Sequence, residues 1–145
     1  MGIRPAFAIA TALAMGTLAA GGPASAADSC RPSALKGAYI FALSGFKITG
    51  ESAAQRTPFA QSGREIFAGD GTLTGVGTAS LNGAVVKLTW KGTYTLGADC
   101  AGTVTISDNT GETSHFDIFA TPDGSNFTYV QTDKGVVNAG WERRQ

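Results

Sequence analysis

Glu65 occupies the most unusual surroundings that this sequence offers to a carboxylate. If Phe59 and Phe67 point into a core, Glu65 points inward with them, and a buried carboxylate must be paired, hydrogen-bonded or neutral. Its pKa would then rise, and Glu65 would become a candidate catalytic acid or base, with Arg64 or a nearby tyrosine hydroxyl as partner. The alternative, which we favour from the sequence, is a β-bulge at Gly63 that leaves Glu65 in water. The two faces of the segment read Phe59, Gln61, Gly63, Glu65, Phe67 and Ala60, Ser62, Arg64, Ile66, Ala68.

His115 is the single histidine, and it shares a strand face with Asp117. The opposite face, with Phe116, Ile118 and Ala120, is more apolar and makes the better inner face. We therefore expect His115 and Asp117 to lie outside and to be solvated. A hydrolytic triad also needs a positioned nucleophile, and the sequence has no G-x-S-x-G elbow.

No metal or cofactor is expected. Asp70 lies between two glycines, and residues 108–112 read Asp-Asn-Thr-Gly-Glu, which gives two acidic turns. Neither has the alternating oxygen ligands and distal glutamate of a 12-residue calcium loop. Asp and Asn at these positions are typical of tight turns. Cys30 and Cys100 have no His or second Cys at ligand spacing, so a zinc site is not expected either.

The first 26 residues have the pattern of a secretory signal peptide. Arg4 gives a positive start, residues 6–20 are almost wholly apolar, and Ala24-Ser25-Ala26 is an A-x-A cleavage site. The sequence therefore predicts a protein exported to the periplasm or beyond, with residues 27–145 as one domain. Two cysteines in an exported chain predict a disulfide between Cys30 and Cys100, which would close a loop of about 70 residues.

The charge of the mature chain excludes two classes of partner. Without residues 1–26 the chain keeps ten basic and eleven acidic residues, a net charge of −1. Nothing builds a basic stripe, so binding to nucleic acid or to an anionic membrane has no electrostatic support. No later stretch is long and apolar enough to insert into a bilayer as a helix. The sequence does not indicate an oligomeric state.

The elements that must position these side chains are strands. Runs rich in Val, Ile, Thr, Tyr and Phe alternate with Gly-, Asn- and Asp-containing turns. Eight consecutive antiparallel strands must close on themselves or stack. We predict a single all-β domain, an eight-stranded antiparallel up-and-down barrel, with a two-sheet sandwich as the alternative. The predicted strands span 37–48, 58–68, 71–81, 84–96, 101–107, 112–121, 125–132 and 136–143.

Two strands predict the inner wall directly. In the fourth strand Val86, Leu88, Trp90, Tyr94 and Leu96 alternate with Lys and Thr. In the third, Gly75 and Gly77 share the inner face with leucines and alanine, which predicts either close approach of another strand, a tight bend or space for a ligand. An eight-stranded barrel is just wide enough to be filled by its own side chains or to hold one small ligand. Both possibilities stay open, with the filled core favoured.

Short motifs add a resemblance to the lipocalin-like, or calycin, barrels. Gly37-Ala38-Tyr39 is similar to that family's Gly-x-Trp, and Arg143 and Arg144 stand where the family places an arginine across the aromatic ring. The segments LKGAYIFALSGF, GREIFAGDGTLTG, GTYTLGADCAGTVTI and HFDIFATPDGSNFTYVQTDKGVV resemble small exported bacterial proteins of unassigned function. The resemblance implies an eight-stranded barrel and brings no catalytic residues with it. A small cyclase barrel, such as allene oxide cyclase, is a neighbouring shape.

Three functions follow as hypotheses. The first is an exported, non-enzymatic barrel that binds a small apolar or aromatic molecule. The second is a cyclase- or isomerase-like barrel enzyme with Glu65 as its one candidate catalytic residue. The third is a structural or surface interaction module. The residues expected to line a ligand cup are Tyr39, Phe41, Glu65, Trp90, Tyr94, Phe116 and Tyr129.

Overall fold

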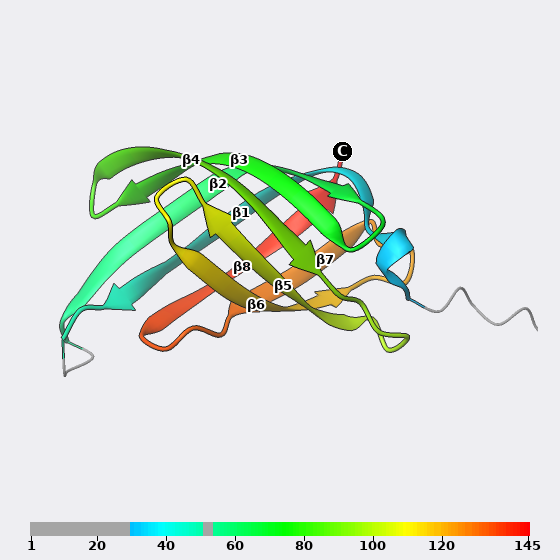
Figure 1. The fold of residues 1–145 in the computed structure, drawn as a ribbon. Coiled ribbons are helices and arrows are strands. Elements are labelled where there is room, and N and C mark those ends of the chain that lie inside the picture. The colour runs from blue at the N-terminus through cyan, green and yellow to red at the C-terminus, as the bar shows by residue number, and fades with distance from the viewer. Residues whose placement is uncertain (1–29, 51–53) are drawn as a thin grey trace, which may run out of the picture.

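Eight strands follow one another around a closed antiparallel sheet, in which β8 pairs with β1 (Figure 1). The computed structural model describes residues 30–50 and 54–145, so the predicted signal peptide lies outside the described residues. The eight-stranded up-and-down barrel is confirmed, and the sandwich alternative is wrong because the sheet closes. The strands are β1 (Lys36–Ile48), β2 (Arg56–Ala68), β3 (Thr72–Leu81), β4 (Ala84–Tyr94), β5 (Ala101–Asp108), β6 (Thr113–Ala120), β7 (Asn126–Gln131) and β8 (Val136–Arg144).

Turn residues set the strand ends. Leu81 pairs with Ala84 across a two-residue hairpin made by Asn82 and Gly83, whose φ angles are 49° and 90°. Such a turn needs positive φ at both central residues, which Asn and Gly adopt most readily. This local chemistry explains why every strand begins and ends within two residues of its predicted limits.

The β1–β2 ladder runs without interruption from Lys36 opposite Ala68 to Ile48 opposite Arg56. Gly63 pairs with Phe41 on one side and with Gly77 on the other. The predicted β-bulge at Gly63 is therefore wrong. The glycine has another cause, since a Cβ atom there would lie 2.8 Å from Cε1 of the inward Phe41 ring. Glu65 consequently points into the barrel with Phe67.

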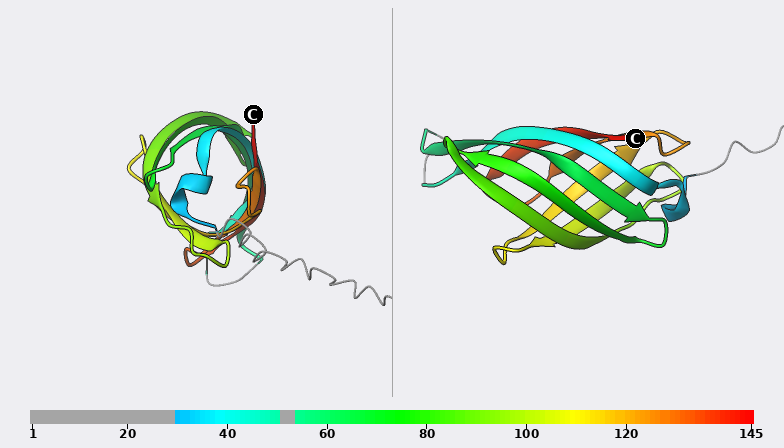
Figure 2. Two further views of the ribbon diagram at one scale, coloured as in Figure 1. Left: turned by 90° about the vertical axis from the view of Figure 1, so that its right-hand side faces the viewer. Right: turned by 90° about the horizontal axis from the view of Figure 1, so that it is seen from above.

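One end of the barrel is plugged by the chain that leads into β1. The 3-10 helix η1 (Pro32–Ala34) lies across this opening when the barrel is viewed along its axis (Figure 2). Leu35 follows it and is fully buried. The Tyr94 hydroxyl donates to the carbonyls of Pro32 and Leu35, 2.9 and 2.8 Å away. A disulfide between Cys30 and Cys100 ties the plug to the β4–β5 connection, as the sequence predicted.

The pair of a tyrosine ring and an arginine that the resemblance implies also lies at the plugged end. The Arg144 guanidinium covers the Tyr39 ring, with its Cζ atom 5.5 Å from the ring centroid, and its Nε and Nη2 atoms donate to the Tyr39 hydroxyl. Tyr39 in turn donates to the Gly124 carbonyl at 2.6 Å. Gly-x-Tyr and Arg144 thus join the beginning and the end of the sheet.

The plugged half of the barrel is solid. Phe67 forms edge-to-face contacts with Tyr39, Tyr94 and Phe127, at centroid distances of 5.0–5.6 Å. Such aromatic contacts add to the free energy gained from burial of their area.

Among the described residues, no helix is long and apolar enough to span a membrane.

Candidate functional site

The other half of the barrel encloses a cavity of about 230 Å³. Its size falls just below the roughly 300–1,000 Å³ of sites for drug-sized ligands, so it suits a smaller molecule. Most of its wall is apolar, with a few polar groups among the rings and aliphatic side chains. The residues that line its walls include Phe41, Leu43, Ala79, Leu88, Trp90, Val104, Ile106, Phe116, Phe127 and Tyr129.

Trp90 separates the cavity from the plugged half. Its indole is buried, as the strand alternation predicts, and its ring contacts Phe41 edge to face at 5.6 Å. The two inner glycines of β3 make room for it. A Cβ atom on Gly75 would lie 2.2 Å from Trp90 Cε2, and one on Gly77 would lie 3.0 Å from Trp90 Cη2. Of the causes predicted for these glycines, the space for a ligand is therefore wrong, because the Trp90 indole fills it.

Glu65 is buried beside this indole, and the Trp90 Nε1–H donates a hydrogen bond of 2.6 Å to Glu65 Oε1. Burial raises the pKa of Glu65 from 4.5 to about 7, while hydrogen bonds from Trp90 and Glu142 act in the opposite direction. The expected partners, Arg64 or a tyrosine hydroxyl, are not the ones that the structure provides. The predicted inward carboxylate has Trp90 and a second carboxyl group as neighbours.

That second carboxyl group, Glu142 on β8, was not predicted. Burial raises the pKa of Glu142 well above its usual range, and the charge of Glu65 and the hydrogen bond to Glu65 raise it further. The opposite effects of their hydrogen bond on the two pKa values make Glu142 the donor and Glu65 the acceptor in this pair. Burial and the two carboxylates also raise the pKa of the neighbouring Tyr129 hydroxyl.

The residue pattern of β8 does not predict that Glu142 points into the barrel. Val137, Ala139 and Trp141 form its more apolar face, yet Val137 and Trp141 are 48% and 47% exposed on the outside. The more apolar face of β8, with Trp141, therefore lies outside, and its more polar face lies inside. The available signal was the arginine position, since Arg144 over Tyr39 fixes residues 142, 140 and 138 on the inner face.

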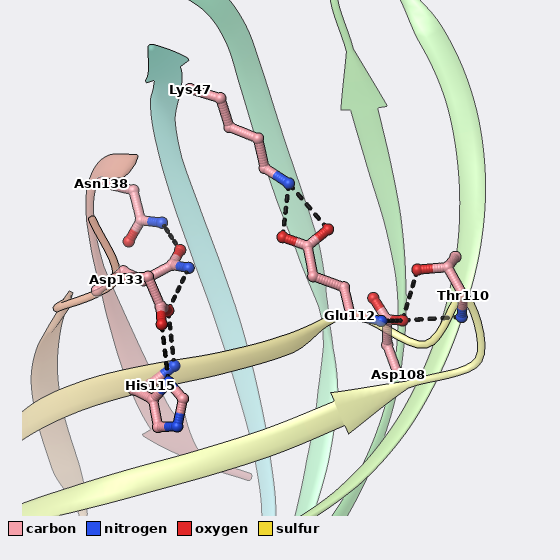
Figure 3. A network of polar contacts seen from close by, with 8 residues as sticks. Lys47, Asp108, Thr110, Glu112, His115, Asp133 and Asn138 are labelled. Atoms are coloured by element: carbon pink, nitrogen blue, oxygen red, sulfur yellow. Dashed lines mark hydrogen bonds and ion pairs between the residues drawn. The ribbon is translucent and has the colours of Figure 1, made fainter. Parts of the chain in front are cut away.

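A chain of hydrogen bonds connects the cavity wall to the outer surface (Figure 3). His115 lies outside, as predicted. Its main-chain N–H donates to Asp133 Oδ2 at 2.8 Å, and its ring Nδ1 lies 2.7 Å from Asp133 Oδ1. Asp133 also accepts from Gln131 Nε2, which turns the Gln131 oxygen toward Asn138 Nδ2. Because a carboxylate only accepts, this order fixes both amide groups. Asn138 Oδ1 is left buried in the wall without a hydrogen-bond partner.

The mouth of the cavity is crossed by an ion pair. Lys47 Nζ on β1 contacts both carboxylate oxygens of Glu112, in the β5–β6 turn, at 2.6 and 2.9 Å (Figure 3). Asp108 Oδ1 orders this turn by accepting from the Thr110 N–H and hydroxyl and from the Glu112 N–H.

In residues 30–50 and 54–145, no group of three or more His, Cys, Asp or Glu side chains is placed to hold a metal ion.

Comparison with known proteins bears on the fold alone. No family model and no curated protein matches the sequence. The chain is similar to a solved structure described as EF1p2_mFAP2b bound to DFHBI, with a TM-score of 0.51 and 13% sequence identity. The similarity covers 83% of this chain and 100% of the other. At this identity, a shared barrel does not carry a shared function.

The residues expected to line a ligand cup divide between the two halves of the barrel. Five of them lie on the cavity wall: Phe41, Glu65, Trp90, Phe116 and Tyr129. Tyr39 and Tyr94 lie in the plugged half, where their hydroxyls donate to main-chain carbonyls. The polar residues of the cavity that sequence reasoning missed include Glu142, Asn138 and Gln131.

Proposed function

We propose that this protein is an exported, non-enzymatic barrel that binds one small apolar or aromatic molecule in its open half. One observation carries the proposal: the same barrel is packed solid at the plugged end and hollow at the other. A protein with a purely structural role would be expected to fill both halves, because interiors are normally close-packed. The similar solved structure with DFHBI bound agrees with a barrel that holds a ligand.

The proposed ligand-contact residues are the five on the cavity wall, Phe41, Glu65, Trp90, Phe116 and Tyr129. Tyr39 and Tyr94 belong to the packed aromatic cluster of the plugged half, next to the inner end of the cavity. Rings arranged around a few polar groups are typical of small-molecule sites, where the rings supply contact area and the polar groups fix orientation.

A fluorescent apolar probe, N-phenyl-1-naphthylamine, tests the proposal on the purified protein. We expect saturable binding of one probe per chain, a blue-shifted probe emission and quenching of tryptophan fluorescence. Ser114→Trp places a large ring at a cavity-lining position and should abolish binding. Its neighbour Thr113 points outward on the same strand, so Thr113→Trp is the matched control and should bind normally. Absence of saturable binding would favour the structural or surface module instead.

Export forms the second part of the proposal. The Cys30–Cys100 disulfide is of the kind that persists in oxidising compartments. Residues 1–26 carry the sequence pattern of a signal peptide. Expression of the full chain in a bacterium, followed by fractionation, should yield a processed protein that begins at Ala27. An unprocessed protein in the cytoplasmic fraction would contradict export.

A barrel enzyme is the second candidate, and the observation that favours it is the position of Glu65. A carboxyl group with a pKa of about 7 beside an apolar cavity is suited to acid–base catalysis at neutral pH. Under this hypothesis, a ligand recovered after incubation would be chemically changed. Glu65→Gln would then stop the change while the affinity for a neutral ligand is kept.

A further inference from the structure

The charged groups around the cavity are unbalanced. Among the described lining residues, four carboxyl groups accompany a single basic side chain, Lys47, which already pairs with Glu112 at the mouth. In the described part of the chain, neither Glu65 nor Glu142 forms an ion pair with a basic side chain. The deep end of the cavity therefore carries uncompensated acidic groups.

The polar atoms left free in the wall are acceptors. Glu142 Oε2 and Asn138 Oδ1 have no hydrogen-bond partner, and the two residues are 95% and 96% buried. Both lie on the inner face of β8, four residues apart, with the Tyr129 ring packed over Gly140 between them. Buried polar groups in folded proteins are nearly always satisfied, so two unsatisfied acceptors on residues that line the cavity indicate a missing donor.

The protein itself supplies too few donors for this site. Trp90 donates one hydrogen to Glu65, and the proton shared between Glu65 and Glu142 supplies another. Two carboxyl groups together offer about eight lone-pair positions, so capacity to accept remains. The amide orientation of Asn138 is fixed through Gln131 and Asp133, so its oxygen is not relieved by rotation.

We infer that the cavity takes an apolar amine, a small aromatic or aliphatic body with one protonated nitrogen, which enters nitrogen first and donates N–H groups to Glu142 and Glu65. This inference rests on the proposed binding function and names its ligand class. The body of the amine would lie against Phe41, Leu88 and Phe116, and the rings near the carboxyl pair would add cation–π attraction. Carboxylate ligands such as fatty acids would be repelled.

Binding of a cation then depends on pH. The carboxyl pair attracts an ammonium group only once it has lost protons, so amine affinity should rise as the pH rises from 5 to 8. The groups that face the pair are Tyr39 from β1, with Arg144 beyond it, and Tyr129 from β7. Farther away, at the mouth, Lys47, Asp108 and Glu112 line the cavity.

Three probes on one aromatic scaffold test the ligand class: 1-naphthylmethylamine, 1-naphthylmethanol and 1-naphthoate. With the disulfide-intact mature protein at pH 8, calorimetry should show the amine binding at least about tenfold more tightly than the alcohol, and no binding of the carboxylate. Glu142→Gln and Glu65→Gln should each weaken the amine about tenfold and leave the alcohol within about twofold. Asp117→Asn removes an acidic charge from the outer face of β6 and is the matched control, with no change expected.

Each outcome decides the inference. If alcohol and amine bind equally, or if the amine ignores both substitutions, the amine class is overturned while the binding barrel stands. If none of the three probes binds, the inference fails together with the proposed function. Should the glutamine variants fail to fold, the pH profile of the unaltered protein decides: amine affinity that stays flat between pH 5 and 8 overturns the inference.

Discussion

The Trp90 indole nitrogen donates to Glu65 Oε1 at 2.6 Å, from a strand two positions away in the barrel. The indole thus fills the space over the β3 glycines and at the same time solvates a buried carboxylate. A hydrogen bond to a charged group contributes roughly 1.5–3 kcal/mol, more than one between neutral groups. This contact joins β4 to β2 at the wall of the cavity.

Trp90→Phe should separate these two roles. The phenyl ring keeps part of the packing and removes the donor, so we expect a loss of at least about 1.5 kcal/mol in the free energy of unfolding at pH 8. The pKa of Glu65 should rise further, because the Trp90 hydrogen bond lowers it. Chemical denaturation and NMR titration of the carboxyl measure both effects. Trp141→Phe, on the outer face, is the control and should change stability by less than about 0.5 kcal/mol. Equal effects of the two substitutions would contradict the assignment.

The stability of the protein should fall as the pH rises from about 4.5 to about 7. In this window an unfolded chain has lost the Glu65 proton, whereas folded Glu65 keeps it, so ionisation favours unfolding. The difference between the two pKa values corresponds to roughly 3 kcal/mol. Glu142, whose pKa is also raised, should continue the fall at higher pH. Urea unfolding at a series of pH values measures the slope. The double variant Glu65→Gln/Glu142→Gln should flatten it, and a slope that persists there would assign it to other groups.

Loss of the disulfide should lower stability by roughly 3–4 kcal/mol, because the cross-link spans 70 residues and limits the unfolded chain. The double variant Cys30→Ala/Cys100→Ala, compared with the oxidised protein in thermal and chemical unfolding, gives the value. Mass spectrometry of the unreduced protein should detect no alkylatable thiol. Two free thiols in the native protein would refute the pairing.

Gly75→Ala should displace the indole, since the new methyl group would lie 2.2 Å from Trp90 Cε2. Overpacking of this kind costs roughly 1–3 kcal/mol. Tryptophan emission should shift to the red, and probe binding in the cavity should weaken. Thr74→Ala, one residue earlier and facing outward, provides the comparison and should leave emission unchanged. An unshifted emission maximum in Gly75→Ala would mean that the indole lies elsewhere.

The fold was predictable because local signals agreed along the chain. Clean alternation in residues 84–96 and turn residues such as Asn82-Gly83 determine strands without any knowledge of their neighbours. The site was less predictable, because polar residues occupy both faces of the Glu65 strand and Gly63 allowed two interpretations. Only pairing with Phe41 and Gly77 resolves them. Glu142 was hidden for a related reason: the inner face of β8 is its more polar face.

The plugged and open ends differ in how the sheet is held, and this has a consequence for motion. β1 and β2 pair over thirteen positions, whereas β4 and β5 pair over only five, from Trp90 to Tyr94, so the first half of β4 extends past its neighbour at the open end. In that half of β4 the Thr89 N–H donates to Asn109 Oδ1, and β5 pairs with no residue before Trp90. Hydrogen exchange should therefore form a gradient, fast near Val85 and Lys87 and slow around Tyr39 and Leu35. The open end can therefore unfold locally, which would let a ligand enter, while the plugged end stays folded.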